Sequence, residues 1–306
     1  MWSFAVARFA RVYPLYLLAI AYIACKSYVV TGAIPLSLPW HILGLQAWLP
    51  DLVDAFAFGP SWSISVEVFL YASLPVLALS LRHLVTVRGL VVATVLTIVV
   101  MVLLAWWFQY AGRATLAATD AGSAHHWLYR MPLTRLGDFL LGIFAARIYV
   151  NVRERPHMDK AGAILAAVGL LSLLFFTTQF WLSTSAFRWD VAYAVPSDLL
   201  ILGVALSPTA ALARFLALPA IVLLGEASYA FYLVHATVAE PLGAGAWAVR
   251  VTAGTLSLEA MILGLILAMA IGIHIGVERP SRVWIRRMLD HGRPPAARTP
   301  LLRYYG

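Results

Sequence analysis

The chain contains a run of twenty residues in which no side chain is charged, Gly89-Leu-Val-Val-Ala-Thr-Val-Leu-Thr-Ile-Val-Val-Met-Val-Leu-Leu-Ala-Trp-Trp-Phe108. As an α-helix, such a run is about 30 Å long, which is the thickness of the hydrocarbon core of a bilayer. The run therefore predicts a transmembrane helix. Of the 306 residues, 62% are hydrophobic and 12% are charged, whereas soluble domains carry roughly 45–50% and about 25%. The mean hydropathy of +0.85 agrees with an integral membrane protein.

Seven other segments are apolar over a similar length, so we expect an all-α, polytopic transmembrane bundle of about eight spans. The eight segments are 9–31, 62–81, 89–108, 132–150, 160–181, 194–207, 220–240 and 255–277. The stretch 35–58 is rich in proline and predicts a loop with a short interfacial helix around Trp40–Trp48. Residues 1–289 are predicted to form the transmembrane domain, and residues 290–306 a basic, proline-rich cytoplasmic tail.

The distribution of lysine and arginine predicts the orientation. With the N-terminus inside, sixteen of the 22 basic residues fall in segments on the cytoplasmic side and six on the other side, so both termini are predicted to be cytoplasmic. Topology then accounts for the net charge of +8, and we expect membrane lipids rather than nucleic acid as partners. The one cysteine, Cys25, excludes an internal disulfide.

One polar group lies near the start of the second predicted span. Ser63, Glu67 and Tyr71 are spaced i, i+4, i+8 and share one helix face. A carboxylate in a span is costly and often marks function. A structural hydrogen-bond cluster explains the same spacing, and both interpretations stay open. Trp62 suits a helix start at the membrane interface.

A second group, Arg8 and Arg11, lies at the cytoplasmic end of the first span. Arginines three residues apart share a helix face and are able to hold phosphate or carboxylate. An anchor that reaches lipid head groups accounts for them as well.

Two further groups lie in later spans. Arg135 and Asp138 are spaced i, i+3 and are expected to pair, and close helix packing at Gly142 is the alternative to a functional role. Ser228, Tyr232 and His235 share a face of the seventh span, where His235 is either a proton carrier or a core histidine. The pair His125-His126 lacks partner ligands at a metal-site spacing, so we predict no metal.

Taken in order, these groups resemble the acyltransferase 3 family of integral membrane O-acyltransferases. The resemblance covers nearly the whole chain and rests on five short motifs in the expected order. The matching elements are Arg8 to Tyr16, Gly59 to Glu67 with Ser65 inside it, Arg135 to Gly142 with Asp138 where the family usually has Glu, Leu224 to His235, and Glu278-Arg279-Pro280.

The resemblance implies an enzyme that moves an acyl group, commonly acetyl, from acyl-CoA to a hydroxyl of an extracytoplasmic glycan or lipid-linked acceptor. It implies acyl-CoA as donor substrate, no permanently bound cofactor, and the bacterial inner membrane as location. Arg8 and Arg11 are then expected to bind CoA, and Glu67 and His235 to support catalysis. The remaining candidates for the substrate pocket are Trp62, Ser63, Ser65, Tyr71, Arg135, Asp138, Ser228 and Tyr232.

The chain departs from the family pattern at its N-terminus. The family has about ten spans, and two of them normally precede the Arg-x-x-Arg element and carry the histidine taken to be the catalytic base. The base is therefore expected upstream of Met1, and this chain by itself is expected to be inactive. Two other classes remain alternatives: a membrane transporter or exporter, which intramembrane charges fit equally well, and a non-catalytic pseudoenzyme subunit.

Overall fold

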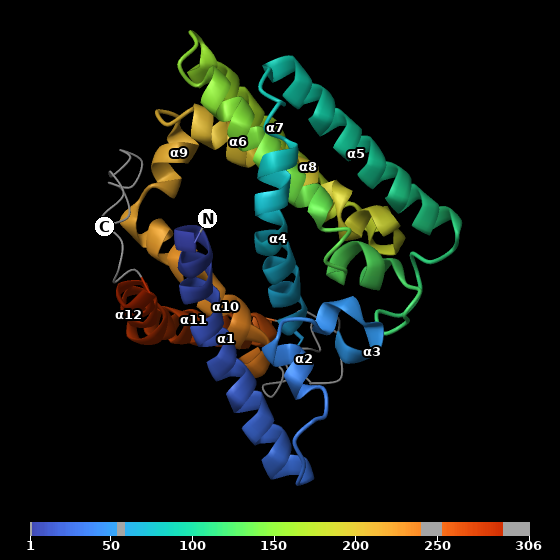
Figure 1. Cartoon of the computed structure of the whole chain (residues 1–306), viewed down its shortest axis with the longest axis vertical. Helices are drawn as coiled ribbons and strands as arrows, with labels where there is room; N and C mark the ends of the chain where they lie inside the picture. Colours follow the sequence, from blue (N-terminus) through green and yellow to red (C-terminus); the bar gives the residue numbers. More distant parts are fainter. Residues whose placement is uncertain (1, 54–58, 240–252, 290–306) are drawn as a thin grey trace. The chain divides into compact units, whose positions relative to one another are not determined.

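The computed structural model describes residues 2–53, 59–239 and 253–289. Within these ranges all regular structure is helical (Figure 1). Each of the eight segments predicted to span the membrane coincides with a helix. These helices are α1 (Trp2–Thr31), α4 (Ser61–Ser80), α5 (Val87–Tyr110), α6 (Leu136–Val152), α7 (Met158–Thr178), α8 (Val191–Leu206), α10 (Pro219–Ala239) and α11 (Ala253–Ile273).

Short helical turns connect or extend these helices. They are α2 (Leu38–Ile42), η1 (Gln46–Trp48), α3 (Pro50–Val53), η2 (His125–Arg130), η3 (Phe180–Thr184), η4 (Ala186–Trp189), α9 (Ala211–Leu216), η6 (His274–Glu278) and α12 (Arg279–Leu289). The predicted short helix around Trp40–Trp48 is thus confirmed as α2 and η1. The predicted tail, residues 290–306, lies outside the described residues.

The lengths of the helices agree with a polytopic membrane protein. Five helical segments are long and apolar enough to cross a bilayer, and the apolar helices Val191–Leu206 and Pro219–His235 are shorter. α6 has 17 residues, which correspond to about 26 Å. The fold is therefore an all-helical, polytopic membrane fold, as the composition predicts.

The chain divides into two compact units. The first comprises Met1–Ala21 and Ala227–Gly306, and the second comprises Tyr22–Glu226. A single transmembrane domain over residues 1–289 stays a prediction.

In the second unit, α7 and α8 lie side by side (Figure 1). Small residues allow this approach. A Cβ placed on Gly169 of α7 would lie 2.6 Å from the backbone nitrogen of Leu200, and one on Gly162 would lie 2.7 Å from Leu206 Cβ. Glycine at such positions lets two helix backbones approach closely, which is how helices associate in membranes.

A second packing centre joins α5 to the turns beside it. Met101, Ala105 and Phe108 of α5 form a buried cluster with residues of η2, α6, η4 and α8. Gly137 brings α6 onto α5, because a Cβ there would lie 2.9 Å from Met101 Sδ. Gln109, near the end of α5, accepts a hydrogen bond of 2.8 Å from the backbone N–H of Ala186 in η4. This cluster fixes the start of α6 and the start of α8.

The turns before α4 are bound to its first residues. The Gln46 side chain donates to the backbone carbonyl of Ser61, and the backbone N–H of Ala47 donates to Ser65 Oγ at 3.3 Å. His41 is fully buried and Nδ1 lies 2.9 Å from the carbonyl oxygen of Ser37. Burial lowers the pKa of His41, against the smaller opposing effect of that hydrogen bond, and so favours a neutral ring.

In the first unit, a hydrogen bond joins α10 to α1, since the Tyr229 hydroxyl donates to the backbone carbonyl of Val12 at 2.8 Å. α11 packs on α10 through Ile262 and Ile266. It continues into η6, where His274 Nδ1 lies 3.0 Å from a carboxylate oxygen of Glu278. Both side chains are 2% exposed, so the Glu-x-Pro element of the sequence contains a buried ion pair or hydrogen bond.

Candidate functional site

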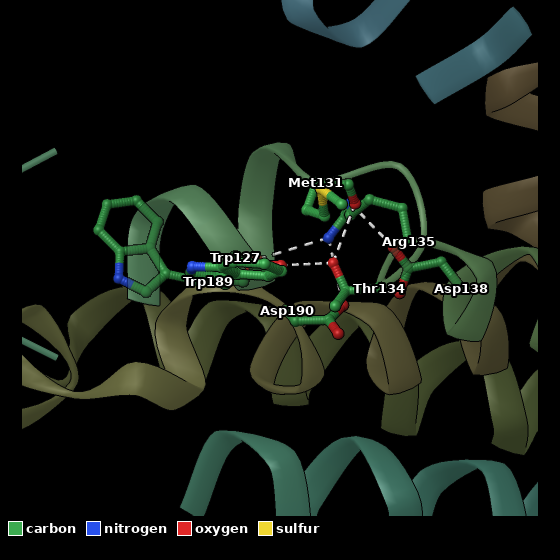
Figure 2. Close-up of polar contacts among 7 residues, drawn as sticks. All are labelled: Trp127, Met131, Thr134, Arg135, Asp138, Trp189 and Asp190. Atoms are coloured by element: carbon green, nitrogen blue, oxygen red, sulfur yellow. Dashed lines mark hydrogen bonds and ion pairs between the residues drawn. The ribbon is translucent and has the colours of Figure 1, made fainter. Parts of the chain in front are cut away.

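Arg135, the residue that precedes α6, binds two carboxyl groups. Its Nη2 lies 2.8 Å from Asp138 Oδ2, and its Nη1 lies 3.2 Å from Asp190 Oδ1. Nη1 also lies 3.4 Å from the carbonyl oxygen of Trp189. Figure 2 shows Arg135 with these partners where the turn between η2 and α6 meets the start of α8. The predicted pair of Arg135 and Asp138 is confirmed, and Asp190 is an addition that the sequence did not indicate.

The local structure holds Arg135 in this place. The Thr134 hydroxyl donates to the carbonyl oxygen of Met131 at 2.9 Å and also contacts that of Trp127, so it ties η2 to the start of α6 (Figure 2). Gly137 packs against Met101 one turn further on. The guanidinium is therefore positioned by a turn and a helix that are both packed on α5.

Asp190 is a buried carboxyl group with a raised pKa. Its exposed fraction is 6%. Burial raises the pKa of Asp190 to about 9, the charge of Asp138 and a hydrogen bond to it add to this rise, and Arg135 opposes it. A carboxyl group with so high a pKa holds its proton near neutral pH, so the protonated Asp190 can donate a hydrogen bond to a neighbouring acceptor.

An aromatic cluster adjoins the charged group. The Tyr129 ring centroid lies 4.6 Å from that of Trp62 and 5.6 Å from that of Trp189. His125 lies 4.4 Å from Trp189, and the Arg135 guanidinium lies 5.8 Å from the Tyr129 centroid. His125 and Tyr129 belong to η2, a π-helical turn, and such turns occur frequently at functional sites.

These residues border a cavity of about 370 Å³, within the range of ligand sites. We call it the α6–α8 cavity. Its lining residues are Tyr129, Arg135, Asp138, Leu141, Gly142, Arg188, Trp189, Asp190, Tyr193, Ala194, Ser197, Asp198 and Ile201. All of them belong to the second unit.

The interpretation of Gly142 as a site of close helix packing is wrong. A Cβ built on Gly142 meets no atom within 4 Å, and the residue lines the cavity. Close packing on this helix occurs at Gly137 instead, where Met101 fills the space.

The face of α4 predicted from spacing is formed, with Ser63, Glu67 and Tyr71 all partly buried. The Tyr71 hydroxyl donates to Glu67 Oε2 at 3.1 Å. The Ser63 hydroxyl donates to the carbonyl oxygen of Pro60 at 3.1 Å. Trp62 reaches the aromatic cluster, whereas the buried Ser65 accepts the hydrogen bond from Ala47. None of these residues is among those that line the α6–α8 cavity.

The other candidates lie in the first unit. Arg8 and Arg11 are partly buried on α1, and the Arg8 guanidinium lies 5.3 Å from the Phe4 ring centroid. On α10, His235 Nδ1 lies 2.6 Å from the carbonyl oxygen of Tyr232. A carbonyl oxygen only accepts hydrogen bonds, so Nδ1 carries a proton, and in the neutral ring Nε2 holds a lone pair. Ser228 is exposed and Tyr232 is partly buried.

The sequence reasoning missed Tyr129, Trp189 and Asp190, and it considered His125 only as a metal ligand. The signal for Asp190 was a lone carboxylate after an aromatic-rich stretch, Phe187-Arg-Trp-Asp190, which precedes a span. Aromatic residues at such places usually indicate only the membrane interface. Among the described residues, no three His, Cys, Asp or Glu side chains group together in a way that could hold a metal ion; the absence of a metal stays a prediction.

Comparison with known proteins adds two findings. Residues 1–277 match the acyltransferase 3 family, and the description of the matching domain is "Acyltransferase domain". The chain is also 28% identical to "Acyltransferase MdmB" of Streptomyces mycarofaciens, in an alignment that covers 94% of this chain and 75% of that protein. No solved structure matches.

Proposed function

The chain belongs to the acyltransferase 3 family, and from this premise we propose that it transfers an acyl group, commonly acetyl, from acyl-CoA to a hydroxyl of an extracytoplasmic glycan or lipid-linked acceptor. The observation that carries the proposal is the match of residues 1–277 to an acyltransferase domain. The likeness to a protein named an acyltransferase supports it. The protein is a membrane acyltransferase, and the proposal concerns its donor, its acceptor and its location in the inner membrane.

In the proposed reaction, the hydroxyl oxygen of the acceptor attacks the carbonyl carbon of the thioester. A carbon–oxygen bond forms, the carbon–sulfur bond breaks, and the hydroxyl proton ends on the sulfur of CoA. A hydroxyl is a weak nucleophile near neutral pH, so the reaction needs a base and correct placement of both substrates.

Arg8 and Arg11 are the residues that we propose for the donor. They are neighbours on one face of α1, and both are partly buried. Guanidinium groups suit the phosphates of CoA because they offer several donors in a fixed plane. The lysine and arginine distribution supports a cytoplasmic position for this end of α1, which is the side on which acyl-CoA is present.

His235 and Glu67 are proposed as supporting residues. His235 has its Nδ1 proton engaged by a backbone carbonyl, which leaves Nε2 to accept a proton or a hydrogen bond. Glu67 accepts a hydrogen bond from Tyr71 and holds a carboxylate within α4. Neither is assigned as the base. The predicted place of the base upstream of Met1, and the expectation that this chain by itself is inactive, stay predictions, so the test uses the product of the gene in its own strain.

The test uses membranes of the strain that carries the gene, supplied with radiolabelled acetyl-CoA. Label is expected in the envelope glycan as an alkali-labile ester, and it is expected to disappear when the gene is deleted. Restoring the gene with Arg8→Gln and Arg11→Gln is expected to raise the KM for acetyl-CoA by about tenfold or more, as loss of charged contacts to phosphate implies.

Arg153→Gln with Arg155→Gln is the matched control. It removes two exposed arginines that are also predicted to be cytoplasmic and is expected to leave the KM unchanged. Equal labelling with and without the gene would refute the proposal. Movement of a cargo without consumption of acyl-CoA would favour a transporter instead.

A further inference from the structure

We propose that the α6–α8 cavity is the acceptor site and that it binds a neutral, hydroxyl-rich ring such as a sugar unit. This inference rests on the proposed function, because it assigns the acceptor side of the same reaction. The proposed acceptor site includes four residues that lie outside the five sequence motifs: Tyr129, Tyr193, Ser197 and Asp198.

The first argument comes from polar groups that face the cavity. Tyr193, Ser197 and Asp198 of α8 line it. Among the described residues, no hydrogen-bond partner in the chain occurs for either of the two hydroxyls or for the carboxyl group. Ser207, the residue directly after α8, donates to the carbonyl oxygen of Gly203, which is how a serine at a helix commonly satisfies its hydroxyl group. The hydroxyl groups of Tyr193 and Ser197 and the carboxyl group of Asp198 are therefore available to bind a polar ligand.

The second argument comes from the charges, which disfavour an anionic ligand. Both terminal nitrogens of Arg135 contact carboxyl groups. Arg188 donates to the carbonyl oxygen of Ser183 and lies 4.2 Å from the Trp189 ring centroid. Three carboxyl groups, those of Asp138, Asp190 and Asp198, belong to the lining as well. Among the described residues, these contacts of Arg188 are with uncharged groups, and the carboxyl partners of Arg135 oppose an anion beside it. The cavity therefore suits a neutral acceptor better than the several phosphates of CoA.

The third argument comes from the aromatic wall. Tyr129 and Trp189 line the cavity together with the apolar side chains of Leu141 and Ile201. A sugar ring has an apolar face of C–H groups and a polar edge of hydroxyls. A site with aromatic faces on one side and carboxyl and hydroxyl groups on the other complements both parts, as ligand sites with a few placed polar groups do.

Gly142 provides a way to fill the cavity with little disturbance of the packing. A side chain there meets no atom within 4 Å at its Cβ. In the labelling assay, Gly142→Leu is expected to raise the KM for a carbohydrate extract of the same cells by about tenfold or more, with the KM for acetyl-CoA unchanged. Gly264→Leu on α11, which also meets no atom within 4 Å, is the control and is expected to behave as wild type. An unchanged acceptor KM in Gly142→Leu, or a raised KM for acetyl-CoA, would overturn the inference.

A second experiment measures binding and does not depend on turnover. Ser197→Cys is made in a Cys25→Ser background, and the protein in phosphatidylcholine nanodiscs is labelled with a small polar methanethiosulfonate. Neutral methyl glycosides are expected to slow labelling at position 197 by about threefold at concentrations near twice their Kd, since the protection factor is one plus the ratio of the glycoside concentration to Kd. Ser183→Cys, outside the cavity lining, is expected to show no protection.

The two experiments separate the two claims. No gene-dependent label from acetyl-CoA would end the proposed function, while protection of position 197 by glycosides would still support a sugar site. Normal label transfer without protection by any glycoside, or protection by inorganic phosphate or CoA instead, would leave the function in place and refute the acceptor site.

Discussion

Replacing Asp190 with asparagine tests the account of the Arg135 group through its dependence on pH. Asparagine imitates the protonated carboxyl group, because its amide oxygen accepts from Arg135 and its amide nitrogen donates to Asp138. Burial, the first cause, and the neighbouring Asp138 raise the pKa of Asp190 to about 9 in the folded protein. In the unfolded chain the same group ionises near its ordinary value of 3.8.

The sign follows from proton binding. Between about pH 4 and about pH 9 the folded protein holds a proton that the unfolded chain has lost, so raising the pH favours unfolding. The contribution of Asp190 to the free energy of unfolding is fully present below the pKa of Asp190 in the unfolded chain. It is lost as the pH rises towards the pKa of Asp190 in the folded protein. The slope is about 1 kcal/mol per pH unit for one proton.

The assay is thermal unfolding of the purified protein in detergent, followed by near-UV circular dichroism from about pH 5 to about pH 8. At about 2 °C per kcal/mol for a chain of this size, the Tm of the wild type is expected to fall by about 2 °C for each pH unit relative to Asp190→Asn. The variant is therefore expected to be the more stable protein at the upper end of the range.

Asp120→Asn serves as the control, since Asp120 is an exposed carboxylate in the loop before η2. It is expected to show the wild-type slope. Equal slopes for the wild type and Asp190→Asn would refute the raised pKa of Asp190, and a large loss of stability in Asp190→Asn at about pH 6 would show that the charged carboxylate is needed.

Three more predictions concern packing and charge. Arg135→Gln is expected to lower the free energy of unfolding by about 3 kcal/mol. This is the lower end for a broken buried ion pair, because the side chains of Arg135 and Asp138 remain 23% and 25% exposed. An equal Tm in wild type and variant would contradict this prediction. Gly169→Ala is expected to lower the free energy of unfolding by about 1–3 kcal/mol, since its Cβ would meet the backbone of Leu200 at 2.6 Å. Gly264→Ala is expected to leave the free energy of unfolding unchanged, since its Cβ would meet no atom within 4 Å. α12 carries Arg279, Arg282, Arg286 and Arg287 on one face and exposes Trp284 and Met288 on the other. A fluorophore on Trp284→Cys in a Cys25→Ser background should therefore shift to the blue when nanodiscs contain phosphatidylglycerol, and Arg282→Gln with Arg286→Gln should remove the shift.

The membrane fold was predictable because its signal is local. A run such as Gly89 to Phe108 satisfies its own backbone hydrogen bonds as a helix, so length and apolarity decide the assignment. Pairs on one helix were equally accessible from spacing. Arg135 with Asp138 and Glu67 with Tyr71 both form contacts in the structure.

The α6–α8 cavity was not predictable, since its residues come from parts of the chain that only packing brings together. Asp190 lies 55 positions after Arg135, and nothing in the spacing of either residue indicates the other. Gly142 shows the same limit, because a glycine that permits close packing and one that borders a cavity look alike in a sequence.

The central claim is acyl transfer to a hydroxyl, and the most direct measurement is the chemical form of label that passes from acetyl-CoA to the envelope. The account predicts an ester that alkali releases as acetate, present with the gene and absent from the deletion strain. Label that remains in the thioester, or an equal amount of ester in both strains, would contradict it.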